Sequence, residues 1–336
     1  MSNYKILEYV WLDVNNEFRS KTKVINHSQN KTFTLDDVPM WNYDGSSTGQ
    51  ALIQNSEVNL KPLKLYLFNK NLNSDSYSHS NLNNNIYYVL CDTDNIESTY
   101  KTYKSVFEKY ENEKPMFGLE QEFFVIPYNE LDNTKCNIES SKYYCGVGYE
   151  ASSIRPYLNE VLNTCLNLNI KLTGMNFEVA PNQAEFQVCN IGLDVCYDLL
   201  MLRFLLVLIG EKYKLLPRFE PKIFSNQNGS GCHMNFSTLT MRDSDSDNFM
   251  SIVNTMTSKL EKKHNEFIEN YYGSGNKERL SGSCETCHYS EFKALKGARN
   301  ASIRIPTLGN YFEDRRPSSN IDPYMACGEL LKCVME

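Results

Sequence analysis

Two glutamates separated by one residue stand in a strongly apolar stretch of the chain. Glu120 and Glu122 lie within residues 117–126, which otherwise contain mainly phenylalanine, leucine, valine and isoleucine. On a β-strand, residues two apart face the same side. The two carboxylates therefore repel each other unless a cation lies between them. This spacing predicts a cation-binding face on a strand.

Further ligands of the same kind occur elsewhere. Glu178 and Glu185 flank a turn at residues 180–182, His233 follows a glycine-rich segment, and Glu313 lies within residues 311–316. Burying an unpaired carboxylate costs on the order of several kcal/mol. Several carboxylates with one imidazole suit Mg²⁺ or Mn²⁺ better than Zn²⁺ or copper. Taken singly, each could be a solvent-facing glutamate or a hydrogen-bonded core histidine, but the whole set predicts a divalent-metal centre.

Arginines gather in the last part of an acidic chain. They are Arg279, Arg299, Arg304, Arg315 and Arg316. Arg304 lies between two isoleucines, so we expect its guanidinium to be paired with an anion. Salt bridges to nearby Asp and Glu are the alternative. Arginines beside clustered carboxylates favour metal-assisted phosphoryl transfer. The chain has neither a G-x-x-x-x-G-K-[ST] motif nor a G-x-G-x-x-G motif, so a nucleotide would be held differently.

Length and charge limit the classes of protein. The chain has 336 residues and a net charge of −7. That length suits two domains. An acidic chain offers no broad positive field, so we expect no nucleic-acid or membrane partner. The longest apolar run, residues 199–209, is interrupted by Arg203 and is shorter than the roughly 18–20 residues that cross a bilayer.

The cysteines indicate a reducing compartment. Eleven is an odd number, and a chain of this size needs no disulfides to fold. With no recognisable secretory signal, we expect a cytoplasmic protein. Residues 284–288 read C-E-T-C-H, the form of covalent haem attachment, but that chemistry belongs to exported proteins. We therefore do not favour haem.

Local patterns outline the elements that must position these residues. The first part predicts strands at residues 9–13, 18–24 and 86–90, an exposed Asn- and Ser-rich loop at 69–85, and a domain boundary at residue 95. The second part predicts strands at 117–126, 170–179, 185–188, 233–237, 302–305 and 311–315, and helices at 96–110, 156–169, 191–213 and 248–271.

Eight segments, in order, resemble glutamine synthetase of the class II, eukaryotic type. They are residues 41–48 (WNYDGSST), 117–122 (FGLEQE), 143–148, 174–179, 185–187, 228–237 (NGSGCHMNFS), 301–306 and 311–320 (YFEDRRPSSN). The resemblance implies an α+β fold. A small β-grasp-like domain would occupy residues 1–95. A large catalytic domain, with an antiparallel sheet flanked by helices, would occupy residues 96–336.

The resemblance also implies an activity and its residues. The reaction is ATP-dependent ligation of ammonia to L-glutamate, giving L-glutamine through a γ-glutamyl phosphate. Three implied metal ligands near glutamate are Glu122, Glu178 and Glu185, and three near the nucleotide phosphates are Glu120, His233 and Glu313. The implied glutamate-binding residues are Asn228, Gly229, Arg279 and Arg315. The implied nucleotide- and phosphate-binding residues are Arg299, Arg304, Asn235 and Ser237.

Two carboxylates and one arginine carry implied catalytic roles. Glu285 matches the carboxylate of a flap that closes over the site, and Asp44 matches the aspartate that takes a proton from ammonium. Arg299 acts with them. A carboxylate suits both roles because it attracts ammonium and accepts a proton. The family assembles as two stacked rings, which implies a decamer in which Asp44 completes the active site of a neighbouring subunit.

The chain departs from the family pattern at several positions. Ala184 and Gln227 stand where the family has tryptophans, Cys284 replaces a histidine, and residues 99–101 lack the usual Asn-x-Arg. Two alternatives therefore accompany an active glutamine synthetase. One is a γ-glutamyl ligase that uses another amine. The other is a catalytically silent ring with a structural or regulatory role, which the six retained ligand types disfavour.

Overall fold

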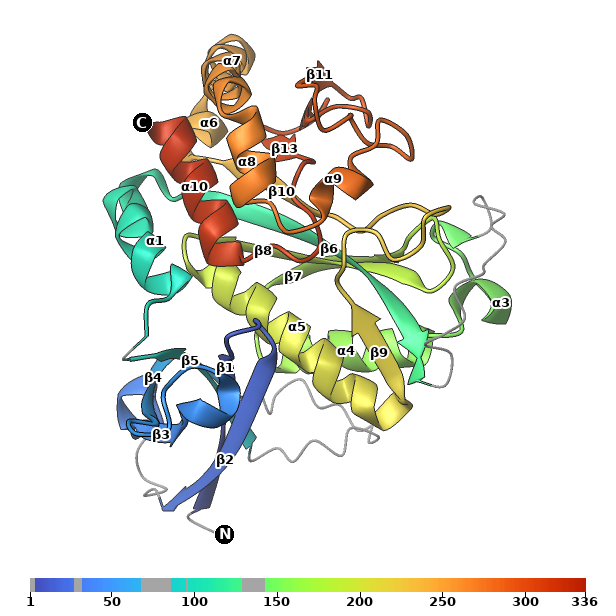
Figure 1. Ribbon diagram of the computed structural model, residues 1–336. Coiled ribbons are helices and arrows are strands. Elements are labelled where there is room, and N and C mark those ends of the chain that lie inside the picture. The colour runs from blue at the N-terminus through green and yellow to red at the C-terminus, as the bar shows by residue number, and fades with distance from the viewer. Residues whose placement is uncertain (1–3, 27–31, 68–85, 95, 129–142) are drawn as a thin grey trace. The chain divides into compact units, whose positions relative to one another are not determined.

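The computed structural model describes residues 4–26, 32–67, 86–94, 96–128 and 143–336. The chain divides into two compact units (Figure 1). One comprises residues 1–102 with 163–170, and the other comprises residues 103–162 with 171–336. The Asn- and Ser-rich stretch at 69–85, predicted to be an exposed loop, lies outside the described residues.

The smaller unit contains a five-stranded mixed sheet in the order β2-β1-β5-β4-β3. Its strands are β1 (Tyr4–Leu12), β2 (Phe18–Asn26), β3 (Trp41–Asp44), β4 (Glu57–Tyr66) and β5 (Ile86–Thr93). β1 and β5 pair in parallel at the centre, and the other pairs are antiparallel. Leu7, Leu60 and Val89 are fully buried on one face, which gives this unit its own core. Alternation of apolar residues along β1 produces that face.

The larger unit is built on a sheet in the order β11-β12-β13-β10-β6-β8-β7, with β9 also paired to β6. Its strands are β6 (Met116–Pro127), β7 (Leu172–Phe177), β8 (Gln183–Ile191), β9 (Leu215–Arg218), β10 (Cys232–Ser237), β11 (Ala294–Lys296), β12 (Ile303–Ile305) and β13 (Phe312–Asp314). All pairs are antiparallel except β11 with β12. The long strand β6 lies at the centre and pairs with three others.

Nine α-helices are present among the described residues that include this sheet. They are α1 (Thr99–Lys109), α3 (Tyr149–Ser152), α4 (Arg155–Asn167), α5 (Asp194–Tyr213), α6 (Leu239–Asp243), α7 (Ser246–Lys262), α8 (His264–Asn270), α9 (Asn276–Arg279) and α10 (Pro323–Met335). α5 packs along β8, β9 and β6, and α10 packs against α7 and α5 (Figure 1). Asp322 caps α10 by accepting hydrogen bonds from the amides of Tyr324 and Met325, and Pro323 occupies its first turn.

The α+β fold class, with a small sheet unit and a larger antiparallel unit, is confirmed. The prediction of a single helix at 248–271 is wrong. The backbone leaves helical geometry at Lys263, with φ −106° and ψ 12°, so α7 ends there and α8 begins. Apolar side chains are buried on both sides of this break, among them Leu260 of α7 and Phe267 of α8. None of the described helices is long and apolar enough to span a membrane.

Candidate active site

Strand β6 presents two carboxylates on one face and a carboxamide on the other. Alternation along the strand directs Glu120 and Glu122 to the same side and Gln121 to the opposite side. On that opposite side, the Gln121 Oε1 accepts a 2.7 Å hydrogen bond from Arg203 of α5. The two glutamates therefore face away from α5. Each joins a different cluster.

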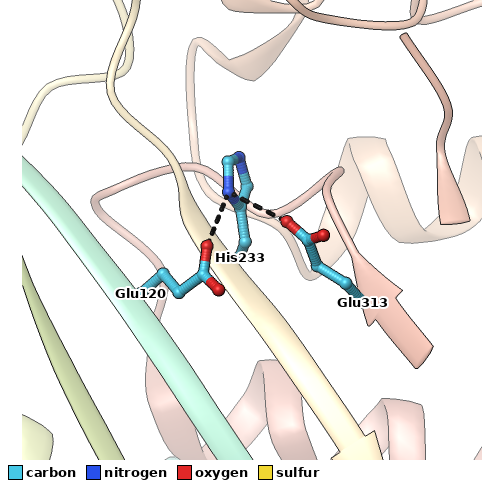
Figure 2. Close-up of side chains that lie close together, drawn as sticks. All are labelled: Glu120, His233 and Glu313. Atoms are coloured by element: carbon cyan, nitrogen blue, oxygen red, sulfur yellow. Dashed lines mark hydrogen bonds and ion pairs between the residues drawn. The ribbon is translucent and has the colours of Figure 1, made fainter. Parts of the chain in front are cut away.

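The first cluster combines Glu120, His233 and Glu313, whose ligand atoms all lie within 4.8 Å of one another. β10 carries His233 directly opposite Glu120 on β6, and β13 adjoins β10 on its other edge. The His233 Nδ1 lies 3.3 Å from Glu120 Oε2 and 3.5 Å from Glu313 Oε1. Figure 2 shows the three side chains converging from three neighbouring strands.

The protonation state of His233 suits metal binding. Burial, followed by the nearby charge of Arg315, holds the pKa of His233 well below its usual range, although Glu313 acts in the opposite direction. A neutral imidazole is the form that ligates a metal. Asn235, also on β10, donates a 2.7 Å hydrogen bond to Glu120 Oε1 and so orients that carboxylate.

The second cluster consists of Glu122, Glu178 and Glu185. Glu178 immediately follows β7, and Glu185 lies on β8, so the tight turn between these strands brings them together. Asn182 makes this turn with a φ of 55°, a conformation that asparagine tolerates better than most residues. The backbone amide of Gly231 donates a 2.8 Å hydrogen bond to Glu122 Oε2.

Electrostatics make this second cluster costly without a cation. Burial raises the pKa of Glu178 to about 7, and burial with the charge of Glu120 raises that of Glu185 to about 8. Burial and the charges of Glu178 and Glu185 also raise the pKa of Glu122 well above its usual range. Three converging carboxylates that resist ionisation fit a hard divalent cation with oxygen ligands. The two clusters adjoin, because His233 Nδ1 lies 3.8 Å from Glu122 Oε1.

Two of the predicted arginines converge on Glu313. Arg304 Nη1 lies 2.7 Å from Glu313 Oε2, and Arg315 Nη1 lies 2.6 Å from Glu313 Oε1. The Nε of Arg304 is buried and has no hydrogen-bond partner among the described residues. Arg316 instead forms a buried pair with Asp314 at 2.6 Å, which is the structural role considered for each arginine.

Arg279 is committed mainly to the backbone. It is 3% exposed, and its Nη2 donates to the carbonyl oxygens of Arg315, Arg316 and Pro317. Burial lowers its pKa to about 10. A side chain built onto Gly231 would lie 3.0 Å from Arg279 Nη1 and 2.8 Å from His233 Nε2. Gly231 therefore allows this guanidinium to approach the first cluster.

The segment that holds Asn228 and Gly229 is closely packed. A side chain on Gly229 would come within 2.4 Å of the Pro221 carbonyl oxygen and 2.5 Å of Arg279 Cγ. Gln183 Nε2 donates to the Gly229 carbonyl oxygen at 3.0 Å. The neighbouring Gln227 is 2% exposed, and neither of its side-chain polar atoms has a partner among the described residues.

The predicted flap residues lie beside an arginine and a tyrosine. Glu285 Oε2 is 3.7 Å from Arg299 Nη1, and both side chains are about half exposed. Arg299 also hydrogen-bonds Tyr144, a contact that the sequence analysis did not identify. Cys284 and Glu285 both have positive φ, 51° and 60°, so the chain turns sharply at two residues that are not glycine. The Cys287 thiol is buried and contacts the Glu291 carbonyl oxygen at 3.5 Å.

Two predicted residues are members of neither cluster. The Ser237 hydroxyl accepts a 3.0 Å hydrogen bond from Arg242, and none of its described hydrogen bonds reaches either cluster. Asp44 belongs to the smaller unit, where it is exposed and accepts hydrogen bonds from the Ser46 and Ser47 hydroxyls. These two bonds and the Ser46 amide lower the pKa of Asp44 and keep it ionised.

Comparison with known proteins decides the family. The family model described as "Glutamine synthetase, catalytic domain" matches residues 100–269. A putative glutamine synthetase of Acanthamoeba polyphaga mimivirus is 40% identical, over the whole chain and 95% of that protein. The chain belongs to the glutamine synthetase family. A glutamine synthetase of Colletotrichum gloeosporioides is 37% identical over 97% of the chain and 91% of that protein.

A solved structure supports the fold. The cryo-EM structure of Plasmodium falciparum glutamine synthetase matches with a TM-score of 0.75 at 18% identity, covering 99% of this chain and 72% of that one. The match to the catalytic-domain model identifies the chain as an enzyme of the glutamine synthetase family, so the predicted class is confirmed. The roles of single residues stay predictions.

Proposed function

We propose that the protein ligates ammonia to L-glutamate with ATP, giving L-glutamine through a γ-glutamyl phosphate. The main support is the pair of adjoining clusters. His233 of the first cluster lies 3.8 Å from Glu122 of the second, and Arg304 and Arg315 border the first. Such a site can neutralise phosphate oxygens and hold a carboxylate at the same time. Membership of the glutamine synthetase family supplies the substrates.

The donor set fits two or more Mg²⁺ or Mn²⁺ ions. Glu120, His233 and Glu313 would hold one ion, and Glu122, Glu178 and Glu185 another. Bound there, the ions would supply charge neutralisation of the ATP phosphates and of the glutamate γ-carboxylate.

The arginines would hold the transferring phosphoryl group. The buried Nε of Arg304 has no hydrogen-bond partner among the described residues, so a phosphate oxygen that enters the site could accept from it. Arg315 donates to Glu313, to the Arg299 carbonyl and to the Glu285 carbonyl, which ties the flap to the phosphate side of the site. Removing water from this region would protect the acyl phosphate from hydrolysis. Asn235 orients Glu120.

The amino-acid side would lie beside Asn228 and Gly229, with Arg279 Nη1 facing it across Gly231. In the first step, a γ-carboxylate oxygen of glutamate bonds to the γ-phosphorus of ATP, and ADP leaves. In the second step, the ammonia nitrogen bonds to the γ-carbon, the bond from that carbon to the phosphate oxygen breaks, and inorganic phosphate leaves. A carboxylate must remove one proton from ammonium before this step and another from the nitrogen of the adduct that collapses to the amide. Asp44 and Glu285 are the candidates, since Asp44 is held ionised by two serines.

Assembly would complete the site. We infer stacked rings, forming a decamer, in which Asp44 acts in the active site of a neighbouring subunit. We expect a cytoplasmic protein, although a Drosophila melanogaster relative that is 33% identical is named a mitochondrial glutamine synthetase. Use of another amine stays an alternative because Gln227 and Cys284 alter the site. A silent ring is disfavoured by the convergence of all six metal-ligand side chains.

Phosphate release from ATP tests this proposal. The purified protein with Mg²⁺ should release phosphate only when glutamate and ammonium are both present, and glutamine should appear in equal amount. Glu313→Ala should abolish release, because it removes a ligand of the first cluster and the partner of two arginines. Lys277→Ala, which breaks an exposed pair with Glu269, is the matched control and should leave release unchanged. Release without glutamine when methylamine or ethylamine is added would favour the alternative amine.

A further inference from the structure

Arg203 of α5 is a buried guanidinium on the side of β6 opposite the two clusters. It is 7% exposed and donates hydrogen bonds to three neutral oxygens, and the carboxylate of Asp322 is close enough to act on its charge. We propose that Arg203 is a positioning residue that fixes the separation of the two carboxylate clusters. This inference rests on the proposed function, since the clusters matter only if they bind metal ions.

The first contact reaches the residue between the two metal-cluster glutamates. Arg203 Nε donates to Gln121 Oε1 at 2.7 Å, and Gln121 Nε2 donates at 2.8 Å to the carbonyl oxygen of Glu122. Gln121 therefore cannot rotate without losing bonds at both ends. Glu120 and Glu122 are its direct neighbours in β6. A fixed Gln121 side chain therefore restrains the backbone from which both carboxylates project.

The second contact reaches the chain segment that follows Arg315. Arg203 Nη2 donates to the Ser319 carbonyl oxygen at 2.8 Å, and Nη1 donates to the Ile321 carbonyl oxygen at 2.8 Å. Gln121 Nε2 also contacts the Ser319 hydroxyl at 2.7 Å. One guanidinium thus ties β6 to the segment that leads away from Glu313 and Arg315.

The same network reaches the glycine-rich segment before His233. The Ser319 amide donates to the Ser230 carbonyl oxygen at 3.0 Å, and the next residue, Gly231, donates to Glu122 Oε2. Arg203, Gln121 and Ser319, here called the Arg203 network, therefore connect the three segments that carry Glu122, His233 and Glu313. No other described arginine bonds both β6 and the 317–321 segment.

Stability alone does not explain an arginine here. Burying a cation is costly even where a carboxylate such as Asp322 acts on it, and an apolar side chain of similar volume often stabilises a core better. What arginine supplies is a rigid fork that donates in several fixed directions, which lysine cannot match. We infer that arginine is present here for the precise geometry of its hydrogen bonds. Substitution of residues that orient metal ligands through hydrogen bonds commonly lowers metal affinity or activity by about 10- to 100-fold.

Arg203→Lys and Ser319→Ala test the inference, with Mn²⁺ binding as the main readout. Free Mn²⁺ is measured by electron paramagnetic resonance during titration of the full-length protein, which requires no turnover. We expect Arg203→Lys to weaken Mn²⁺ binding about 10-fold or more, and Ser319→Ala by less. We also expect kcat to fall by about 10- to 100-fold, with KM for glutamate changing by less than about 3-fold.

Val253→Ala on α7 is the control for simple destabilisation. Val253 is fully buried and belongs to no cluster, so its loss lowers the melting temperature through packing alone. Its Mn²⁺ titration should match the wild type. Ser319→Ala leaves the Arg203 hydrogen bonds in place, because Arg203 bonds the Ser319 carbonyl oxygen. If Arg203→Lys does not fold, Gln121→Met decides the matter, since it removes the oxygen on β6 that accepts from Arg203.

The outcomes separate this inference from the proposed function. A Mn²⁺ titration of Arg203→Lys that matches the wild type would overturn the positioning role, as would a matching titration of Gln121→Met where Arg203→Lys does not fold. A wild-type protein that binds Mn²⁺ but makes no glutamine would contradict the proposed function, and the Mn²⁺ titrations would still test Arg203. A wild-type protein that binds no Mn²⁺ would overturn both.

Discussion

Glu120 and Glu122 are separated by one residue on β6 and face the same side, yet they belong to different clusters. Glu120 lies with His233 and Glu313, and Glu122 lies with Glu178 and Glu185. The strand therefore acts as the wall shared by two neighbouring sites. The same substitution at these two positions should therefore change the stability of the protein differently.

Glu122→Gln should stabilise the metal-free protein and disable the enzyme. Burial and two like charges disfavour the Glu122 carboxylate, and a neutral amide removes that cost. At pH 8 with a chelator, each kcal/mol gained raises Tm by about 2–4 °C. Thermal melts and glutamine formation are the measurements. Glu120→Gln is the comparison, because Glu120 lies beside His233 and accepts a hydrogen bond from Asn235. An equal gain in Tm for both variants would contradict the assignment.

Metal-free protein should lose stability as pH rises from about 5 to about 8. The pKa of Glu178 is about 7 and that of Glu185 about 8, against an ordinary value of 4.5. Between these values the folded chain holds protons that the unfolded chain has released. The stabilisation is therefore complete below pH 4.5 and is lost as pH passes through 7 and 8. Thermal melts with a chelator at several pH values measure this loss.

Divalent metal should reverse this pH dependence. Binding requires ionised carboxylates, so Mg²⁺ or Mn²⁺ added at pH 7 should release protons. Calorimetric titrations in buffers of different ionisation enthalpy count those protons. Binding enthalpies that are identical in all buffers would contradict the raised pKa values of the second cluster.

Gln227→Leu should raise the free energy of unfolding by about 1–3 kcal/mol, because the buried carboxamide has no hydrogen-bond partner among the described residues. Urea unfolding measures the change. Gln121→Leu is a matched control with the same change of side chain. The Gln121 carboxamide is hydrogen-bonded at both ends, so its loss should lower stability. A loss of stability in both variants would show that Gln227 has partners in solution.

Mixing two inactive variants should restore activity if Asp44 acts on a neighbouring subunit. Asp44→Asn lacks the exposed carboxylate of the smaller unit, and Glu313→Ala lacks a ligand of the first cluster. In rings assembled from both, some sites combine an intact Asp44 with an intact Glu313. Co-expressed variants should recover up to about a quarter of wild-type activity if the subunits mix randomly. Complete inactivity of soluble mixed rings would contradict action between subunits.

The sequence carried the chemistry of the site more clearly than its geometry. Alternation along β6 was enough to predict that Glu120 and Glu122 share a face, and the apolar surroundings were enough to predict that a cation is needed. Which glutamate joins which cluster depends on pairing between β6, β10 and β13. No local pattern encodes that pairing, so the division of ligands came only from the family resemblance.

Local sequence patterns also failed to predict several other features of the structure. Arg279, Arg304 and Arg316 all belong to the arginine-rich last part of the chain, yet the bonds of Arg279 and Arg316 go to backbone carbonyls and to Asp314. Arg203 looked like an interruption of an apolar helix, because its partners are far away in sequence. The break at Lys263 was missed because both α7 and α8 continue one amphipathic pattern.

The sequence distances across the site also constrain the order of folding. Gln121 and Ser319 are 198 residues apart, and Glu120 and His233 are 113 apart. Closing loops of this length carries an entropic cost that local contacts must first offset, and such long-range pairing is slow. We therefore expect hairpins such as β7 with β8 to form early and the site to assemble last. A divalent ion present during refolding would then act on the final step and speed the recovery of native protein more than it speeds the first collapse.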